Sequence, residues 1–120
     1  MPDLQDTTAI ARLKKRSDFV RTQKQGRKWI AKSFIVEVIE NNENQLRVGF
    51  TVSKRVSKLA VTRNLLKRHL RHAAREVLES YAHHSIDLVL IARQSTKDQD
   101  FKTLQKDLHW CLRKLGFDKK

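Results

Sequence analysis

Several residue types are scarce in this chain of 120 residues, and each shortage excludes a class of protein. The single cysteine, Cys111, cannot form an intramolecular disulfide, which excludes a disulfide-stapled fold and fits a reducing compartment. Three glycines and one proline exclude a linker-rich or disordered chain. No apolar run reaches the ~18 residues that span a membrane, and residues 1–6 do not resemble a signal peptide. We therefore expect one cytoplasmic domain over residues 1–120.

Acidic residues are also missing from a long internal segment. Between Glu43 and Glu76 the chain has no Asp or Glu and nine Lys or Arg, and its formal net charge is +13. Apolar residues recur through this segment at helical spacing, so the charge belongs to a folded surface rather than to a flexible tail. Such a surface predicts a nucleic-acid partner, with a merely solvated face or a membrane-bound basic helix as alternatives. A stand-alone nuclease would need metal-binding carboxylates there.

The predicted elements follow the order helix, strand, strand, helix, strand, helix. The helices are predicted over residues 18–25, 62–82 and 100–115, and the strands over residues 31–39, 45–52 and 87–92. The first two strands are expected to form an antiparallel hairpin, and the third to be buried on both faces. Residues 1–11 are expected to fray. The order predicts an α+β or α/β sandwich, in which helices pack a small, mainly antiparallel sheet.

The helix predicted from its N-cap at Thr62 carries the strongest functional signal. A helical wheel gathers its apolar residues into one buried stripe, made of Leu66, Leu70, Ala73 and Val77. One flank of that stripe is polar and purely basic, made of Asn64, Lys67, Arg68, Arg71 and Arg75. Like charges one turn apart cost a few tenths of a kcal/mol per pair. A bound phosphate backbone would remove that cost, so this flank is the predicted contact surface.

The remaining candidates for chemistry are weak. Cys111 lies in an apolar helical stretch, which favours a buried core residue over a catalytic thiol. His83, His84 and Asp87 could hold a metal, but a loop is the favoured interpretation. No pair of carboxylates has a spacing that indicates acid–base catalysis. The acidic cluster near the first turn is expected to be solvated and consists of Glu37, Glu40 and Glu43.

Two central motifs resemble those of a known family, the bacterial ribonuclease P protein component. Residues 47–55, RVGFTVSKR, are similar to the family strand R-x-G-x-x-V-S-K-K/R. Residues 60–71, AVTRNLLKRHLR, are similar to its signature helix R-N-R-x-K-R-x-x-R. Segments near residues 13–19 and 87–93 extend the resemblance over about residues 12–115. The chain departs from the pattern where relatives carry an arginine or an aromatic residue, at Leu65, Gln23 and Glu37.

The resemblance implies both a fold and a function. The fold is expected to be similar to the second domain of a small-subunit ribosomal protein, with an unusual left-handed strand–helix–strand crossover. The function is that of a protein subunit of ribonuclease P, which removes the 5′ leader of precursor tRNA. The resemblance places the catalytic groups and Mg2+ on the RNA subunit, so no catalytic residue, protein-bound cofactor or obligate protein partner is expected.

The resemblance also assigns residues to two surfaces. The signature helix and the loop before it would face the RNA subunit through Lys54, Arg55, Lys58, Arg63, Asn64, Lys67, Arg68 and Arg71, and the basic flank of the wheel adds Arg75 to this set. A cleft beside the first helix would hold the leader of precursor tRNA through Arg16 and Phe19. Core packing is the alternative role for Phe19. The rival function is a plain RNA-binding module such as a ribosomal protein, which needs no second groove for a single strand.

Overall fold

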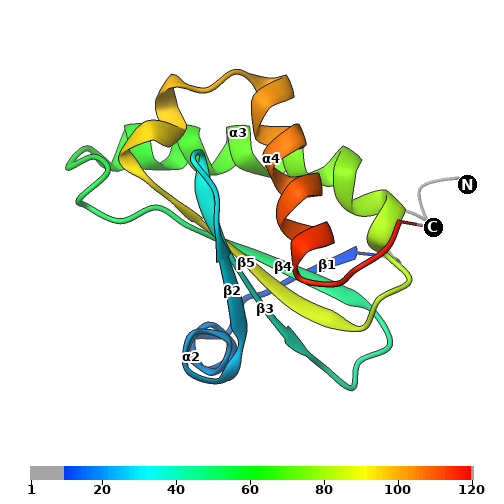
Figure 1. Cartoon of the computed structure of the whole chain (residues 1–120). Helices are drawn as coiled ribbons and strands as arrows, with labels where there is room; N and C mark the ends of the chain where they lie inside the picture. Colours follow the sequence, from blue (N-terminus) through cyan, green and yellow to red (C-terminus); the bar gives the residue numbers. More distant parts are fainter. Residues whose placement is uncertain (1–9, 120) are drawn as a thin grey trace, which may run out of the picture.

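The computed structural model describes residues 10–119, which form one five-stranded sheet with helices on both faces (Figure 1). The strands are β1 (Ile10–Arg12), β2 (Arg27–Ile30), β3 (Phe34–Glu40), β4 (Leu46–Thr51) and β5 (Ile86–Ala92). The helices are α2 (Arg16–Gln25), α3 (Ala60–Leu78) and α4 (Phe101–Lys114), with short 3-10 helices η1 (Glu79–Tyr81) and η2 (Gln94–Asp98). Within these described residues, no helix is both long and apolar enough to cross a membrane.

Strand β5 lies between β3 and β4, so the predicted hairpin of β3 and β4 is wrong. Strand β5 pairs antiparallel with β3 and parallel with β4. Strand β1 extends the sheet parallel to β4, and β2 extends it antiparallel to β3. The sheet is therefore mixed rather than mainly antiparallel. The physical reason is the composition of β5, which is apolar on both faces and gains most from a central position between two strands.

The connection from β4 through α3 to β5 joins neighbouring parallel strands and is left-handed (Figure 1). The resemblance implied this handedness, whereas the general rule for such crossovers predicts the right-handed form. Helices α3 and α4 lie on one face of the sheet, and α2 lies on the other (Figure 1). The α+β prediction is thus confirmed, with α2 adding a partial third layer to the expected sandwich.

Two strands at the edges of the sheet were missed. Ile10 and Ala11, expected to fray, belong to β1 and pair with Leu46 and Arg47 of β4; the rest of that predicted frayed segment lies outside the described residues. Strand β2 was missed because its four residues include two exposed cations and show no clear alternation. It turns into β3 through a tight turn closed by the Ala31 amide, which donates to the Phe34 carbonyl at 2.9 Å.

The predicted apolar stripe of α3 is confirmed, and α4 also buries one apolar face. The four stripe residues of α3 are buried, and so are four residues of α4, namely Leu104, Leu108, Cys111 and Leu112. Burial raises the pKa of the Cys111 thiol to about 12, which fits an inert core residue. Helix α3 begins at Ala60, so Thr62 lies inside its first turn rather than at its N-cap.

Candidate nucleic-acid interface

The nine residues predicted to contact RNA lie on α3 and on the loop before it. We call this set the basic surface. Six of its side chains are exposed, while Arg63, Lys67 and Arg71 are half-buried. Within residues 10–119 none of its cations forms an ion pair; the ion pairs there join Arg21 and Arg47 to acids at the other side of the sheet. The basic surface therefore presents uncompensated positive charge, which favours a polyanionic partner.

The loop between β4 and α3 is held in place by its own residues and by side chains of α3 and η2. Val56 is buried, and its amide donates to the Ser53 carbonyl at 3.1 Å. The Arg63 guanidinium donates to the carbonyls of Ser57 and Lys58 at 3.0 and 2.9 Å. The exposed cations of the loop, Lys54, Arg55 and Lys58, are therefore displayed on an ordered turn. Arg63 has a structural contact that the sequence did not indicate, and its contact with RNA stays a prediction.

Apolar side chains stand exposed at the start of α3. Leu65 replaces an arginine of the family pattern, and because it lies outside the buried stripe of the helical wheel, the sequence predicts that it is exposed. The structure confirms this, since Leu65 is 57% exposed and lies near exposed Leu59 and Val61. The departure therefore removes a cation from the basic surface without removing anything from the core.

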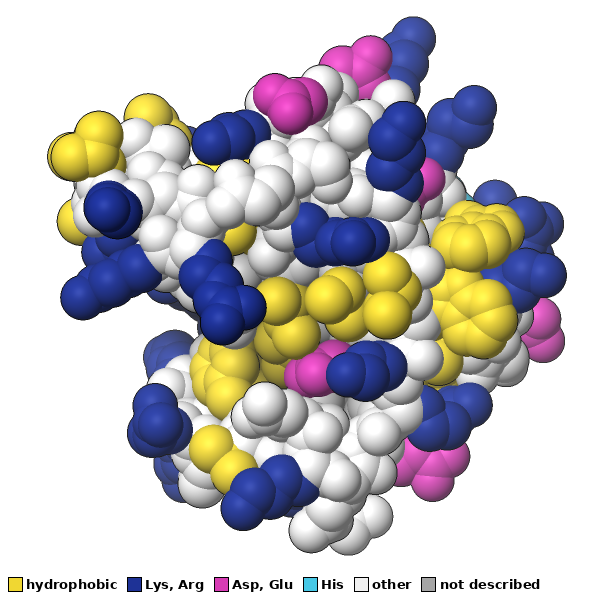
Figure 2. Space-filling view, turned by 60° about the vertical axis from the view of Figure 1, so that its left-hand side comes forward, with side chains coloured by type: hydrophobic (Ala, Val, Ile, Leu, Met, Phe, Trp, Pro, Cys, Tyr) yellow, Lys and Arg dark blue, Asp and Glu magenta, His cyan; other side chains and the backbone are white. Residues whose placement is uncertain are grey.

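A cleft lies between α2 and the strands β3, β4 and β5, on the face of the sheet opposite α3. Its volume is about 540 Å3, and it is lined by Lys14, Arg16, Phe19, Val20, Gln23, Glu37, Thr51, Val89 and Ile91. Figure 2 shows a hollow with hydrophobic side chains on its floor and Lys and Arg side chains along its rims. Both predicted leader-binding residues line this cleft, with Arg16 exposed and Phe19 half-buried.

Phe19 reaches the sheet at Gly49 of β4. A Cβ atom at position 49 would lie 2.5 Å from the Phe19 ring, so any larger residue there would displace the ring from its present position. Phe19 thus packs against the sheet at Gly49 and also lines the cleft. Core packing and cleft lining, the two roles weighed for Phe19, are therefore compatible.

Glu37 is buried in the floor of the cleft, so the prediction that it is solvated is wrong. It lies in the middle of β3, only 6% exposed, and not at the end of a hairpin. Burial raises the pKa of its carboxyl group, and the charge of Lys28, its neighbour on β2, lowers it by less. Glu40 and Glu43 are exposed as expected.

A buried ion-pair network holds α2 on the sheet, and the sequence did not reveal it. Asp87 of β5 is fully buried and accepts two hydrogen bonds from the Arg47 guanidinium, both at 2.7 Å. Asn41 donates to the same carboxylate at 2.7 Å, and Arg21 of α2 lies 3.6 Å away. These bonds occupy Asp87, and the described residues contain no cluster of three or more side chains that could hold a metal ion. The metal interpretation of residues 83–87 is not supported.

Comparison with known proteins shows similarity to one family over most of the chain. A sequence model of the ribonuclease P family matches residues 8–116. The ribonuclease P protein component of Paramagnetospirillum magneticum is 38% identical over 112 residues, which cover 89% of this chain and 84% of that relative. The corresponding protein of Clostridioides difficile is 38% identical over 96 residues, which cover 80% and 83%.

Solved structures share the fold as well. The RNase P protein of Staphylococcus aureus matches with a TM-score of 0.72 at 30% identity, covering 88% of this chain and 94% of that one. The RNase P protein of Thermotoga maritima matches with a TM-score of 0.72 at 28% identity, covering 85% and 96%. The matches span both surfaces described above, the basic surface and the cleft.

Proposed function

We propose a detailed role for this chain from the premise that it belongs to the ribonuclease P protein component family. In this role the chain is a cytoplasmic protein subunit that assists removal of the 5′ leader of precursor tRNA. The basic surface binds the catalytic RNA subunit, chiefly through charge-assisted hydrogen bonds from Arg and Lys to phosphates. The cleft beside α2 holds the single-stranded leader.

The cleft is the observation that carries this proposal. A plain RNA-binding module needs a basic surface but no second groove. This chain has both, on opposite faces of one sheet. The cleft combines an aromatic ring at Phe19 with the cations Lys14 and Arg16, the combination that single-stranded RNA requires for stacking and for phosphate contacts.

The chemistry belongs to the RNA in this proposal. Mg2+ usually keeps several waters and is held by substrate phosphates with only one or two carboxylates, which suits a site built mainly from RNA. Among the described residues no three His, Cys, Asp or Glu side chains cluster as candidate ligands. We assign no catalytic step to a metal on this chain, and the RNA subunit is proposed to hold the ions.

Cleavage of precursor tRNA at low Mg2+ tests the function. We compare a bacterial ribonuclease P RNA alone, this protein alone, and the two mixed. We expect cleavage at the mature 5′ end to be far faster in the mixture, and no cleavage by the protein alone. Absence of stimulation with a matched RNA would contradict the proposal and leave a basic RNA-binding domain.

Substitution of Phe19 tests the cleft separately. Phe19→Ala should weaken binding of precursor tRNA with a leader by about 1–3 kcal/mol, the usual contribution of one base stacked on an aromatic ring. Affinity of the assembled holoenzyme for mature tRNA should change little. Val20→Ala is the matched control, because Val20 lines the same cleft without an aromatic ring. Equal losses for both tRNAs would assign Phe19 to packing alone.

A further inference from the structure

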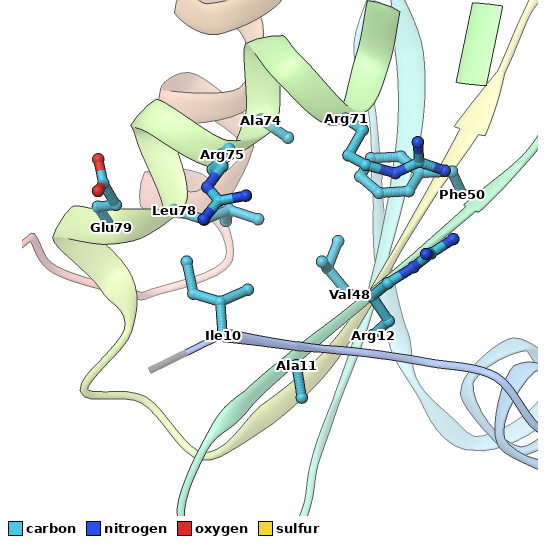
Figure 3. Close-up of a pocket in the computed structure, with 10 residues that line it drawn as sticks. All are labelled: Ile10, Ala11, Arg12, Val48, Phe50, Arg71, Ala74, Arg75, Leu78 and Glu79. Atoms are coloured by element: carbon cyan, nitrogen blue, oxygen red, sulfur yellow. The ribbon is translucent and has the colours of Figure 1, made fainter. Parts of the chain in front are cut away.

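A second cavity lies on the opposite face of the sheet, between α3 and two strands, the edge strand β1 and its neighbour β4 (Figure 3). Its volume is about 440 Å3, within the range of roughly 300–1,000 Å3 that holds small ligands. Six of its ten lining residues are apolar, namely Ile10, Ala11, Val48, Phe50, Ala74 and Leu78. The proposed function gives this cavity no role.

Three guanidinium groups line the same cavity, from Arg12, Arg71 and Arg75. None of the three makes an ion pair within residues 10–119. The Nε atom of Arg71 is buried and has no hydrogen-bond partner there. Burial lowers the pKa of Arg71, and the charges of Arg12 and Arg68 lower it further, although a guanidinium stays protonated. The cavity thus gathers three like charges, and Glu79 is the one acidic residue among those that line it.

The charges are unevenly distributed along the cavity. Figure 3 shows Arg71 and Arg12 at one end, close to the Phe50 ring, and Glu79 at the other end. The Arg71 guanidinium lies 5.8 Å from the centroid of that ring. An anionic group is therefore favoured at the Arg71 end, where an aromatic ring and the apolar walls adjoin it. Phosphate next to a flat, weakly polar ring system is the chemistry of a nucleotide.

We propose that this cavity binds one unstacked nucleotide of the RNA subunit. The base enters the apolar chamber, and its phosphate lies between Arg12 and Arg71. The RNA origin follows from Arg71 and Arg75, which line the cavity and also belong to the basic surface, so a bound RNA strand continues directly into it. The inference rests on the proposed function only for the source of the nucleotide.

Binding of small probes to the full chain tests the cavity itself. AMP, adenosine and inorganic phosphate are titrated while the backbone amides are followed by NMR. We expect saturable shifts at Ile10, Val48 and Ala74, with AMP binding at least about fivefold more tightly than phosphate, the lower limit for one stacked base. Shifts by AMP that match those by phosphate alone would overturn the proposal.

Two substitutions separate the base from the phosphate. Ala74→Leu fills the chamber and should weaken both AMP and adenosine, whereas Ala82→Leu, which lies outside the cavity, should weaken neither. Arg12→Gln should weaken AMP severalfold and leave adenosine unchanged, with Arg113→Gln on α4 as the charge-matched control. Arg12 is exposed, so this arm stands even if Ala74→Leu does not fold. Unchanged AMP affinity in Arg12→Gln would contradict the phosphate position.

Affinity for the RNA subunit decides the source of the nucleotide. Ala74→Leu should weaken assembly with that RNA by about fivefold or more, and Ala82→Leu should not. Loss of AMP binding with unchanged assembly would assign the cavity to a free nucleotide and overturn the RNA origin. Amide shifts caused by deletion of residues 1–9, without any response to AMP, would assign it to the chain's own N-terminal segment. Failure of the unaltered protein to stimulate cleavage concerns the proposed function and leaves the AMP result intact.

Discussion

Two acidic side chains, Asp87 and Glu37, are buried on the same face of the sheet. Because their surroundings differ, they have opposite effects on the stability of the fold. Asp87 is fully buried and has a bidentate partner in Arg47 and a further donor in Asn41. Glu37 is nearly as buried, but its pKa is raised because burial outweighs the charge of Lys28. Burial of an ionised group is costly unless it is paired and hydrogen-bonded. Asp87 therefore stabilises the attachment of α2, and ionised Glu37 destabilises the fold.

Removal of the Asp87 charge tests its structural role. Asp87→Asn leaves Arg47 without its carboxylate and should lower the free energy of unfolding by about 3 kcal/mol, the lower end for a broken buried pair. Arg47 is 19% exposed at its side chain, which keeps the loss at that lower end. Asp98→Asn is the surface control and should change stability by less than about 0.5 kcal/mol. Denaturant unfolding measures both, and equal effects would contradict the network's role.

The raised pKa of Glu37 predicts a dependence of stability on pH. The folded state binds this proton more tightly than the unfolded state, so stability falls as pH rises from about 4.5 through the folded pKa. Glu37→Gln should therefore raise the melting temperature at pH 7, and the difference from the unaltered protein should vanish below pH 4. Glu40→Gln removes the same charge at an exposed position. A Glu37→Gln melting temperature at pH 7 that does not exceed that of Glu40→Gln would contradict the prediction.

Helix α3 serves both the fold and the proposed binding of RNA, through different faces of the same helix. Its stripe of buried residues attaches it to the sheet and to α4, while its basic flank stays free of ion pairs with other described residues. The helix has no acidic residue in its first turn and no side-chain cap at Leu59. Its position therefore depends on packing and on the loop contacts of Arg63, rather than on capping.

Arg68 provides the sharpest test of the basic flank. It is exposed on α3 and makes no ion pair within the described residues. Arg68→Ala should weaken binding to the RNA subunit and reduce the slope of log K against log salt by about one unit, as expected for one lost phosphate contact. Arg113→Ala removes an equal charge from the exposed end of α4. Equal slopes for Arg68→Ala and the unaltered protein would exclude this contact.

The whole molecule carries far more positive charge than it neutralises internally. The formal net charge is +13, and the three ion pairs among residues 10–119 all involve Asp18 or Asp87. Mutual repulsion of the remaining cations opposes the compact state. An RNA partner that binds the basic surface would relieve this repulsion, so assembly and stability are expected to be coupled.

Salt should therefore stabilise the isolated protein. We expect the melting temperature to rise between 10 mM and 0.5 M sodium chloride, because screening weakens the repulsion. Sulfate at about 10 mM should raise it further than chloride at the same ionic strength, because a divalent anion binds clustered guanidinium groups. A fall in melting temperature with added salt would mean that the Asp87 network dominates the electrostatics of the fold.

The sequence predicted much of the functional interpretation, but it did not predict which distant residues contact one another. The buried stripe of α3, the exposed Leu65 and the inert Cys111 were all predicted correctly from local patterns. The burial of Glu37 was missed, because it depends on α2 covering that part of β3. The contacts of Asp87 were missed for a similar reason, since Arg47 and Arg21 lie 40 and 66 positions away along the chain.

The sequence by itself determined the periodic elements, the excess of positive charge and the motifs of the family, because each depends on residues close together in the chain. The tertiary structure decided the order of the strands, since β5 gains most burial between β3 and β4. It also created the cleft and the cavity. The cleft needs α2 against the sheet, and the cavity between α3 and β1 needs Arg12 beside Arg71. Packing alone brings such distant residues together.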